Sequence, residues 1–438
     1  MTAKMIAKNP MSDEINQIKP YEKNAKQHEK KQLLQLAKIV AEVGWRQPVL
    51  VNQDGVIVVG HGRWYAWKEF GDKMHLPPIW VIDDKGSAIH GGPSDKPLSP
   101  EQETTYRLAD NKLNESKWEM GLVIDELKTL SEMMIDLTGF TTDLILETKE
   151  DDFDLSAVGT PKSNTGDIYE LGPHKIICGD STDAETYKKL LGDERPVLIF
   201  TDPPYSVDYL SAAGMTYSSE KYGGTGGKIF NDDKSPAEAL EFYKQVLTRL
   251  HEFSTDNASI YWWFASRITD INMEAFRATG WHYSQTAIWL KNSLIYSPGQ
   301  LYHRIYEPCM VGWKESGGAH YRDIIFSNMT ELWTLDKKTF ADYLDIWYQK
   351  RDPTSKYIHP TQKPVQLAER ALKRSSQKGD LILDAFLGSG STLIAADQLD
   401  RRCYGVELDQ KYVDAVVTRW CQFKDVTHVI KNGIDILW

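Results

Sequence analysis

The sequence predicts an α/β protein, in which a mostly parallel sheet follows a smaller α+β domain. With 438 residues and 41% hydrophobic content, the chain can bury a sizeable core and is long enough for two or three domains. Strand-like and helix-like segments alternate after residue 166, which is typical of a parallel sheet with helical crossovers. An acidic, turn-rich stretch at 147–166 lacks apolar periodicity and separates the two parts.

These features predict three segments. We expect a domain at 12–112, a helical connector and linker at 113–165, and the main α/β domain at 166–425. The main domain has strands predicted at Lys175–Cys178, Val197–Thr201, Ala258–Phe264, Ser284–Leu290, Leu381–Ala385 and Cys403–Val406. Its predicted helices are Ala184–Leu191, Pro236–Phe253, Val365–Arg374 and Thr392–Asp397.

Composition narrows the class of protein. No apolar stretch approaches the length that crosses a bilayer, and the first residues lack the apolar region of a secretory signal, so we expect a cytoplasmic protein with no membrane partner. The four cysteines are far apart, which predicts buried free thiols and no metal site. The formal charge of −11 disfavours a surface that binds nucleic acid everywhere, but it does not exclude a local basic groove.

A glycine turn follows the apolar strand residues Leu381 to Leu383. The residues are Asp384-Ala385-Phe386-Leu387-Gly388-Ser389-Gly390-Ser391-Thr392, and such a turn lets the backbone approach a ligand. A second strand, one helix later, ends in Glu407, an acid suited to a ribose diol. Together they indicate a nucleoside-cofactor site. An ordinary strand–turn–helix is the alternative, and Leu393 at the third glycine position disfavours dinucleotide binding.

A second polar motif, Asp202-Pro203-Pro204-Tyr205, ends the apolar run that precedes it. The amino group of adenine or cytosine is a poor nucleophile because its lone pair is delocalised into the ring. Acceptors on Asp202 and on the Pro203 carbonyl would take its two N–H groups and localise that lone pair. The prolines hold both acceptors at one angle, and Tyr205 can stack on a base that has left the helix. A plain Asp-Pro-Pro turn is the alternative.

The predicted N-terminal domain begins with a helix at Lys31–Val43, followed by strands Val49–Asn52 and Val56–Val59 around an Asp54-Gly55 hairpin. Gly60-His61-Gly62-Arg63 then leads into a predicted helix, Trp64–Phe70. A phosphate site at this turn is conceivable, but spacing alone favours a plain strand-to-helix turn. The order resembles a ParB/sulfiredoxin-like domain over about 15–111. Because His61 and Gly62 depart from the charged box of its nucleotide-binding members, the resemblance implies a DNA-contacting or regulatory role.

The motifs of the second part resemble those of S-adenosylmethionine-dependent DNA amino-methyltransferases. The resemblance rests on Asp202-Pro203-Pro204-Tyr205, on the glycine turn after Asp384, on His359-Pro360-Thr361-Gln362-Lys363-Pro364 and on Cys178-Gly179-Asp180-Ser181. The catalytic motif precedes the cofactor motif, as in the β group of these enzymes. This implies a Rossmann-like class I methyltransferase sheet with circularly permuted motif order.

The resemblance also implies a role for each matching position. Asp202, Pro203, Pro204 and Tyr205 would hold the target base, and S-adenosyl-L-methionine would be the cofactor. The implied cofactor-binding residues are Asp180, near the adenine of the cofactor, Thr361 and Lys363, near its methionine end, and Asp384, Phe386, Gly388, Gly390, Thr392 and Glu407.

Target recognition in that family lies between the catalytic motif and the His-Pro-Thr-Gln-Lys-Pro box, which places recognition insertions here at about 206–232 and 300–358. The second interval contains basic and aromatic residues suited to phosphate contact and base stacking. Each of them is equally compatible with an ordinary solvent-exposed surface. They are Tyr302-His303-Arg304, Lys314, Arg322 and Tyr348-Gln349-Lys350-Arg351. Trp262-Trp263-Phe264 is interpreted as core packing.

The resulting hypothesis is a site-specific DNA methyltransferase that flips adenine out of the duplex and methylates its N6 amino group. Two alternatives stay open: methylation of cytosine N4, and a ParB-like DNA-binding regulator whose methyltransferase half is inactive. Double-stranded DNA is the expected partner. A homodimer and a cognate restriction nuclease are compatible with the family.

Overall fold

The computed structural model describes residues 18–20, 30–44, 47, 49–51, 56–70, 79–81, 101, 120–140, 142, 145–151, 153, 158–205, 234–295, 301–315, 344–349 and 363–438. The chain divides into two compact units, Met1–Ile145 and Leu146–Trp438. Both motifs predicted to carry chemistry, Asp202–Tyr205 and the glycine turn, belong to the second unit.

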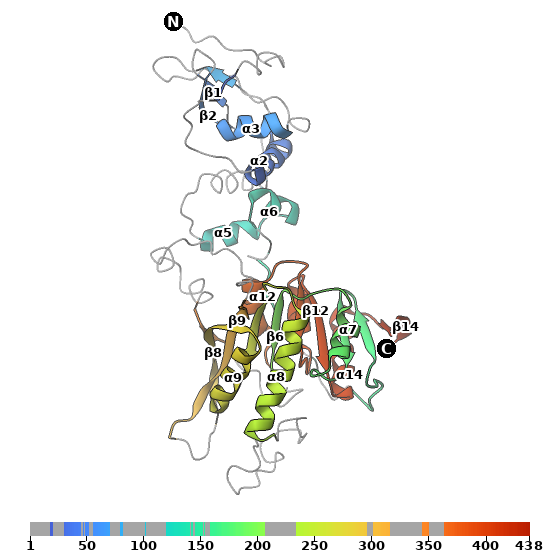
Figure 1. The fold of residues 1–438 in the computed structure, drawn as a ribbon. Helices are drawn as coiled ribbons and strands as arrows, with labels where there is room; N and C mark the ends of the chain where they lie inside the picture. The colour runs from blue at the N-terminus through green and yellow to red at the C-terminus, as the bar shows by residue number, and fades with distance from the viewer. Residues whose placement is uncertain are drawn as a thin grey trace. The chain divides into compact units, whose positions relative to one another are not determined.

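The first unit contains a small sheet with strand order β2-β1-β3 (Figure 1). Leu50 pairs with Val59 in antiparallel register, so the predicted hairpin is confirmed, while β3 pairs with β1 in parallel. The described elements are α2 (Lys30–Val43), β1 (Val49–Val51), β2 (Ile57–Val59), α3 (His61–Phe70), β3 (Ile79–Val81), α5 (Met120–Leu127) and α6 (Glu132–Thr138).

The glycine turn of the first unit differs from its prediction. Helix α3 begins at His61, three residues earlier than the predicted start at Trp64. Gly60 adopts a φ of +99°, a conformation open to glycine, and its carbonyl accepts a hydrogen bond from the Trp64 amide at 3.0 Å. The chain therefore turns at one residue and enters the helix at once, as expected for a plain strand-to-helix turn.

The second unit is built on an eleven-stranded sheet in the described part of the chain, with order β10-β8-β9-β7-β6-β11-β12-β5-β4-β13-β14. Strands β7, β6, β11, β12 and β5 run parallel, which confirms the predicted mostly parallel core. The strands are β4 (Ile168–Leu171), β5 (His174–Cys178), β6 (Leu198–Thr201), β7 (Ser259–Trp263), β8 (Trp281–Ile295), β9 (Arg304–Lys314), β10 (Ile346–Tyr348), β11 (Leu381–Asp384), β12 (Arg402–Glu407), β13 (His428–Lys431) and β14 (Ile434–Leu437).

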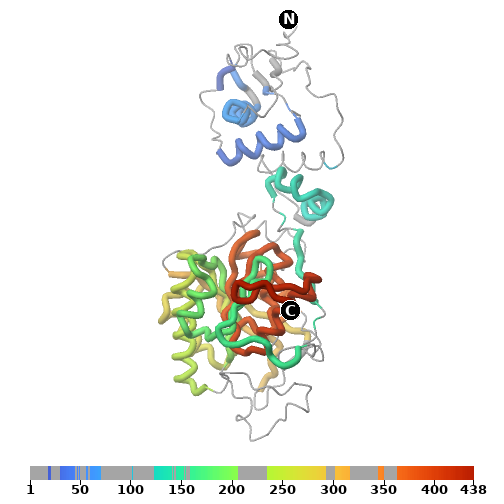
Figure 2. The backbone as a smooth tube through the Cα atoms, turned by 90° about the vertical axis from the view of Figure 1, so that its right-hand side faces the viewer, coloured from blue at the N-terminus to red at the C-terminus, as the bar shows by residue number. Residues whose placement is uncertain are grey.

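Helices cover both faces of this sheet. Successive residues of a strand point to opposite faces of the sheet and pack in two separate cores. Ile199 packs with residues of α7–α9, and Leu198 packs with residues of α12–α14. In Figures 1 and 2 the two groups of helices lie on opposite sides of the strands. The helices are α7 (Ala184–Leu191), α8 (Pro236–Phe253), the short 3₁₀ helix η5 (Ser266–Ile268), α9 (Thr269–Ala278), α12 (Val365–Ser375), α13 (Ser391–Gln398) and α14 (Gln410–Lys424).

Local sequence explains where α8 begins. Ser235 accepts a hydrogen bond from the Glu238 amide, Glu238 bonds back to the Ser235 amide, and Pro236 is the first helical residue. The capping box satisfies amides that would otherwise lack partners, and the proline has no amide N–H that needs one. The predicted bounds of α7 and α8 agree with the structure.

Two segments outside the predicted strands and helices pack onto the second unit. The strap, defined as the described residues 146–151, 153 and 158–163, is bound at Thr148, whose amide and hydroxyl donate to Glu369 Oε2 on α12 at 2.7 Å each. Its Asp151 pairs with the buried Arg419 on α14. At the other end of the chain, β13 pairs with β4 and extends the sheet. The second unit thus includes residues on both sides of the predicted 166–425 domain.

The interval 300–358, predicted as a recognition insertion, contributes β9 and β10 to the sheet. The interval 206–232 lies outside the described residues, as do Arg322, Lys350 and Arg351. All four cysteines are free and buried, as predicted. No helix in the described ranges is long and apolar enough to cross a membrane.

Candidate active site

The predicted site residues of the second unit converge at one edge of the sheet. Because β5, β6, β11 and β12 are parallel, their carboxyl ends share an edge, where ligands bind in sheets of this kind. Asp202 follows β6, Asp384 ends β11, Glu407 ends β12 and Asp180 follows β5. The structure therefore brings the two predicted motifs together.

Asp384 holds the glycine turn in place. Its Oδ1 accepts hydrogen bonds from the Thr201 hydroxyl at 2.8 Å and the Phe386 amide at 3.1 Å, and its Oδ2 accepts from the Thr392 hydroxyl at 2.7 Å. Burial raises the pKa of Asp384 to about 6. With these donors around a buried carboxyl group, its role in this structure is to anchor the turn between β11 and α13.

The glycine turn has the backbone conformation that its sequence predicts. Gly388 and Gly390 adopt φ angles of +52° and +84°, which side-chain-bearing residues rarely take. A Cβ atom at Gly390 would meet Val416 at 3.1 Å. Leu387, which occupies a position where glycine is usual in the similar family, packs over Gly405 of β12, whose added Cβ would lie 2.4 Å from Leu387 Cδ2.

Glu407 faces the same turn from the neighbouring strand. Its Oε2 accepts from the Gly388 amide at 2.8 Å, and its Oε1 accepts from the Asp409 amide at 2.8 Å. Burial, with repulsion from Asp409 and Asp384, raises the pKa of Glu407 to about 7. Asp180 is exposed at the same edge, where its Oδ1 accepts from the amide and hydroxyl of Thr182 at 2.8 Å each.

The Asp-Pro-Pro-Tyr motif is anchored from α8. The Tyr243 hydroxyl donates to the Pro204 carbonyl at 2.8 Å. Asp202 Oδ2 pairs with Lys363, while Asp202 Oδ1 is buried and has no hydrogen-bond partner among the described residues. A buried carboxylate oxygen without a donor is costly to leave unpaired, so this atom is positioned to accept a hydrogen bond from a ligand.

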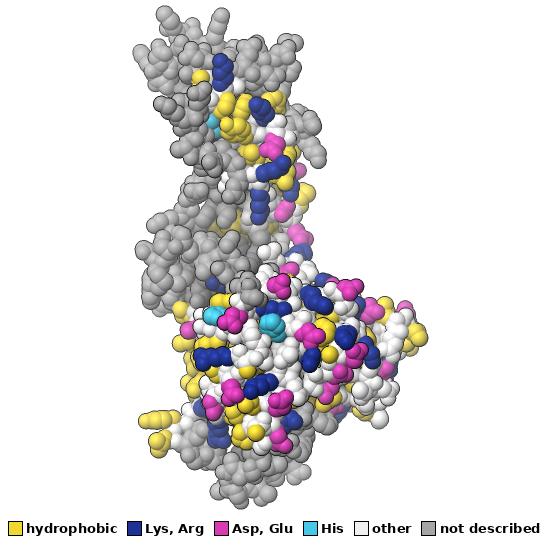
Figure 3. All heavy atoms as spheres, viewed as in Figure 1, with side chains coloured by type: hydrophobic (Ala, Val, Ile, Leu, Met, Phe, Trp, Pro, Cys, Tyr) yellow, Lys and Arg dark blue, Asp and Glu magenta, His cyan; other side chains and the backbone are white. Residues whose placement is uncertain are grey.

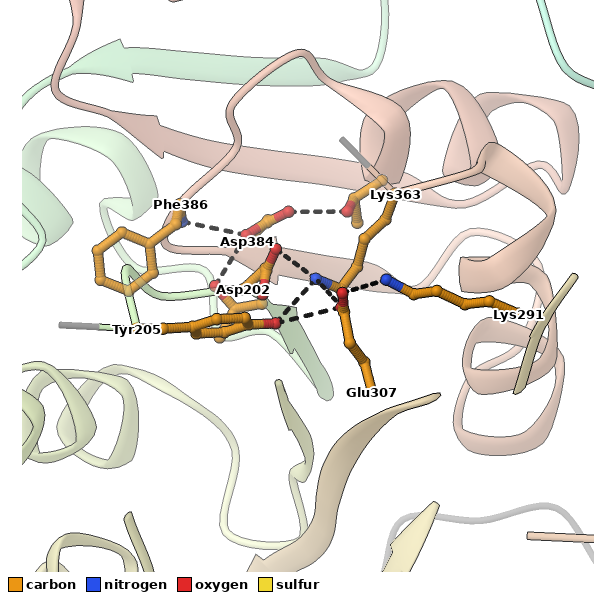
Figure 4. A network of polar contacts seen from close by, with 9 residues as sticks. Asp202, Tyr205, Lys291, Glu307, Lys363, Asp384 and Phe386 are labelled. Carbon is orange, nitrogen blue, oxygen red and sulfur yellow. Dashed lines mark hydrogen bonds and ion pairs between the residues drawn. The ribbon is translucent and has the colours of Figure 1, made fainter. Parts of the chain in front are cut away.

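Lys363, which precedes α12, stands at the centre of a charged network (Figure 4). Its ammonium pairs with Asp202, lies 3.4 Å from Glu307 Oε2, and donates to the Tyr205 hydroxyl at 3.2 Å. Glu307 also pairs with Lys291. Burial lowers the pKa of Lys363, but Asp202 and Glu307 outweigh it and the pKa lies above its usual range.

The pKa values of the two carboxyl groups in this network are shifted in opposite directions. Burial raises the pKa of Glu307, but Lys363 and Lys291 outweigh it and hold the pKa at about 2. Burial, to which Glu307 adds repulsion, raises the pKa of Asp202 above its ordinary value despite the nearby Lys363. Glu307 is therefore the permanently ionised member, and Asp202 is the one more readily protonated.

Glu307 and Lys291 were not predicted as site residues. They lie on β9 and β8, where Ile305-Tyr306 precedes Glu307 and Ile288-Trp289-Leu290 precedes Lys291. A charged residue directly after an apolar stretch of a strand was the available signal, because such groups are almost never buried without a partner. Pairing of the two strands, with Trp289 opposite Glu307, brings both charges to the Asp202 edge.

Two further predicted residues, Thr361 of the cofactor set and Lys314 of the recognition interval, have different outcomes. Thr361, together with the rest of 351–362, lies outside the described residues. Lys314 does not offer a surface contact, because its buried ammonium donates to the Ser254 carbonyl at 2.8 Å and burial lowers its pKa. It ends β9 at the edge opposite Asp202, since β9 runs antiparallel to β7. Trp262 and Trp263 are core residues, as predicted.

The sheet, the glycine turn and the acids at its carboxyl edge define a Rossmann-like α/β chain of the class I methyltransferase type, with the permuted motif order predicted. The chain belongs to the DNA methylase family, whose model matches residues 197–418.

The chain is also similar to individual proteins. The chain is similar to the type II methyltransferase M2.DpnII of Streptococcus pneumoniae, with 28% identity over 52% of this chain and 85% of that protein. It is also similar to M.BglII of Bacillus subtilis, with 22% identity over 55% of this chain and 67% of that protein. Among solved structures, the M1.HpyAVI–SAM complex shares 19% identity and a TM-score of 0.37, covering 56% of this chain and 98% of the other.

Proposed function

We propose that this chain transfers a methyl group from S-adenosylmethionine to the exocyclic amino group of a base in DNA, with adenine N6 as the acceptor. The observation that carries the proposal is Asp202 Oδ1, a buried oxygen without a partner among the described residues. It belongs to the Asp-Pro-Pro-Tyr motif and shares a sheet edge with the glycine turn. An amino N–H is a donor of the kind that this oxygen lacks.

The glycine turn and its neighbours fit the cofactor. Gly388 and Gly390 keep the loop free of side chains, Glu407 presents a carboxylate to ribose hydroxyls, and Asp180 is exposed at the adenine end. The half-buried ring of Phe386 packs 6.0 Å from that of Phe242, which holds it beside the turn. Bound S-adenosylmethionine would supply a methyl group activated by the adjacent sulfonium.

The residues on the base side orient the nucleophile. Asp202 Oδ1 and the Pro203 carbonyl would accept the two N–H groups of the amino group, which directs its lone pair toward the methyl donor. Tyr205 is held at its hydroxyl by Lys363 and offers a ring for stacking. The target atom is inaccessible inside a duplex, so the base has to flip out.

DNA contact fits the end of the β8–β9 hairpin. Since β8 runs parallel to β7, Ile295 and Arg304 lie at the Asp202 edge of the sheet. Next to Arg304, Leu301 and Tyr302 are 96% and 85% exposed, and apolar and aromatic groups of this kind contact bases. Figure 3 shows interspersed acidic and basic side chains on the α8–α9 face, so we place DNA at the strand ends instead of on that face.

The proposal also covers the target base, a partner nuclease and the role of the first unit. An aspartate at the first catalytic position favours adenine in the similar family, and cytosine N4 is the alternative acceptor. The type II names of M2.DpnII and M.BglII support a cognate restriction nuclease as a partner. The first unit, which resembles a ParB-like domain, would contact DNA, and a homodimer is compatible with this arrangement.

Labelled cofactor and mixed-sequence DNA test the proposal. We expect the wild-type chain to label DNA, and nucleoside analysis of the product to give N6-methyladenine. Asp202→Ala should lower transfer by about 100-fold or more while the cofactor still binds, because Asp202 faces the base. Asp435→Ala, which alters an exposed side chain in an ion pair with His428, is the matched control. Unchanged transfer by Asp202→Ala would contradict the role assigned to Asp202. If the wild-type chain bound DNA without labelling it, the alternative of an inactive regulator would be favoured.

A further inference from the structure

Lys363 places its ammonium among three oxygens at the base side of the site. A lysine ammonium carries three N–H donors, and Lys363 contacts Asp202 Oδ2, the Tyr205 hydroxyl at 3.2 Å and Glu307 Oε2 at 3.4 Å. Its side chain is 8% exposed. In this arrangement Lys363 orients Asp202 and Tyr205.

Among the four described members of the network the charges balance. Asp202 and Glu307 contribute two carboxylates, and Lys363 and Lys291 contribute two ammonium groups. The Lys291 side chain is 3% exposed and pairs with Glu307 Oε1, so Glu307 bridges the two lysines. Removing one member of a buried charged group leaves an uncompensated charge, and therefore each member constrains the others.

Glu307 determines whether the Oδ1 atom of Asp202 stays available to a ligand. If Lys363 lost the carboxylate of Glu307, the N–H directed at it would be drawn to the carboxylate that Lys363 still contacts, Asp202, whose Oδ1 has no partner among the described residues. The lysine would then bridge both carboxylate oxygens and occupy the atom assigned to the amino group. Glu307 prevents this by drawing that N–H to the opposite side.

We propose that Glu307 and Lys291 are positioning residues for methyl transfer, which act through Lys363 to keep Asp202 Oδ1 free for the target amino group. The inference rests on the proposed function. Neither residue touches the base or the cofactor in this scheme. Lys291 acts one step further away, because it keeps Glu307 ionised and packs its ammonium 4.3 Å from the centre of the Trp289 ring.

Three variants test the inference: Glu307→Gln, Lys291→Gln and the double variant. Glu307→Gln should lower kcat about 10- to 100-fold and leave the KM for the cofactor unchanged. In the double variant Asp202 and Lys363 remain as one charge-balanced pair. Because Lys291 acts only through Glu307 in this scheme, we expect the double variant to be no less active than Glu307→Gln alone, whereas independent structural damage would multiply the two losses.

The pH dependence of kcat provides a second measurement. The negative charge of Glu307 raises the pKa of Asp202, so Glu307→Gln should move the acid limb of the profile to lower pH. Asp384 and Cys309 also face this group and are unchanged in all variants. A loss of folding alone would scale the whole profile without moving it.

The outcomes separate this inference from the proposed function. If the wild-type chain transfers no methyl group to DNA, the proposed function fails. If it does and Glu307→Gln retains full kcat, or loses activity only through the cofactor KM, or the double variant falls to the product of the single losses, the inference is overturned. Thermal denaturation and cofactor binding of each variant establish that it is folded, and the double variant keeps the test valid where Glu307→Gln does not fold.

Discussion

Three carboxyl groups at the carboxyl edge of the sheet differ in the donors that reach them. Asp384 accepts from Thr201, Phe386 and Thr392. Glu407 accepts two backbone amides, and Asp202 keeps one oxygen without a partner in the described part of the chain. At the residue scale, the three acids therefore differ in environment: Asp384 anchors the turn, and the oxygens of Glu407 and Asp202 fit their proposed roles in holding the cofactor and the base.

Glu407 predicts a pH dependence of cofactor binding. A ribose diol donates to the ionised carboxylate, and the raised pKa of about 7 means that Glu407 becomes protonated as the pH falls through that value. We expect the cofactor dissociation constant to rise below about pH 7, by up to tenfold per pH unit, as measured by calorimetry. Glu407→Gln should bind weakly with little pH dependence, and an equally steep profile in this variant would assign the effect to another group.

The raised pKa of Glu407 also affects the free energy of unfolding. The folded pKa of about 7 lies above the ordinary value of 4.5, so the folded state holds its proton more tightly than the unfolded state. Glu407 therefore lowers the free energy of unfolding progressively as the pH rises from about 4.5 to about 7. Thermal denaturation of the wild type and Glu407→Gln across this range separates the contribution of this residue from the rest.

At the element scale, the glycine turn depends on its fit against β12. Leu387 is buried and lies over Gly405, where an added Cβ would come within 2.4 Å of Leu387 Cδ2 and 3.0 Å of its Cγ. The absence of a side chain at Gly405 thus compensates for the leucine in the loop. This pairing of two positions in different elements was not visible in the motif itself.

Gly405→Ala tests that fit. The added methyl group displaces Leu387, and the free energy of unfolding should fall by about 1–3 kcal/mol, with weaker cofactor binding because Gly388 follows Leu387. Leu387→Ala introduced into the same background should recover part of both losses. Gly159→Ala is the control, because nothing lies within 4 Å of its added Cβ. Denaturant unfolding measures the effect, and Gly405→Ala with wild-type stability would contradict it.

At the scale of the whole molecule, the second unit contains every described residue of the candidate site and the strap that binds to it. The strap reaches α12, which follows Lys363, through Thr148 and Glu369. It reaches the glycine turn through Asp151 and Arg419, since Arg419 also donates to the Ser389 carbonyl at 2.8 Å. Residues predicted as a linker thus brace both halves of the site.

Two truncated chains test the contribution of the strap separately from that of residues 1–145. A chain that begins at Leu146 should fold and methylate DNA at a single-turnover rate close to that of the full chain. One that begins at Gly166 loses Asp151 and leaves the buried Arg419 without its carboxylate, a change worth about 3–5 kcal/mol, so its Tm should fall clearly. Loss of transfer in the longer chain would mean that residues 1–145 are needed for the site.

Much of the fold and site was predictable because the signals are local. Helix α8 is specified by its capping box, and the core strands by apolar runs of a few residues. The motifs at Asp202 and Asp384 were identified from residue types whose chemistry is evident. Strand β9 was not predicted, because its Glu307-Pro308 pair interrupts the apolar pattern and its place between β7 and β8 comes from long-range pairing.

The order of residues alone therefore specified the two motifs, the parallel core and the chemistry of an acid, two prolines and an aromatic ring. Only the tertiary structure placed Glu307 and Lys291 in one network with Lys363, and only it showed that Asp202 Oδ1 has no partner among the described residues. The physical reason is that hydrogen bonds within a turn depend on near neighbours, whereas charge balance in a buried site depends on strands that are far apart in sequence.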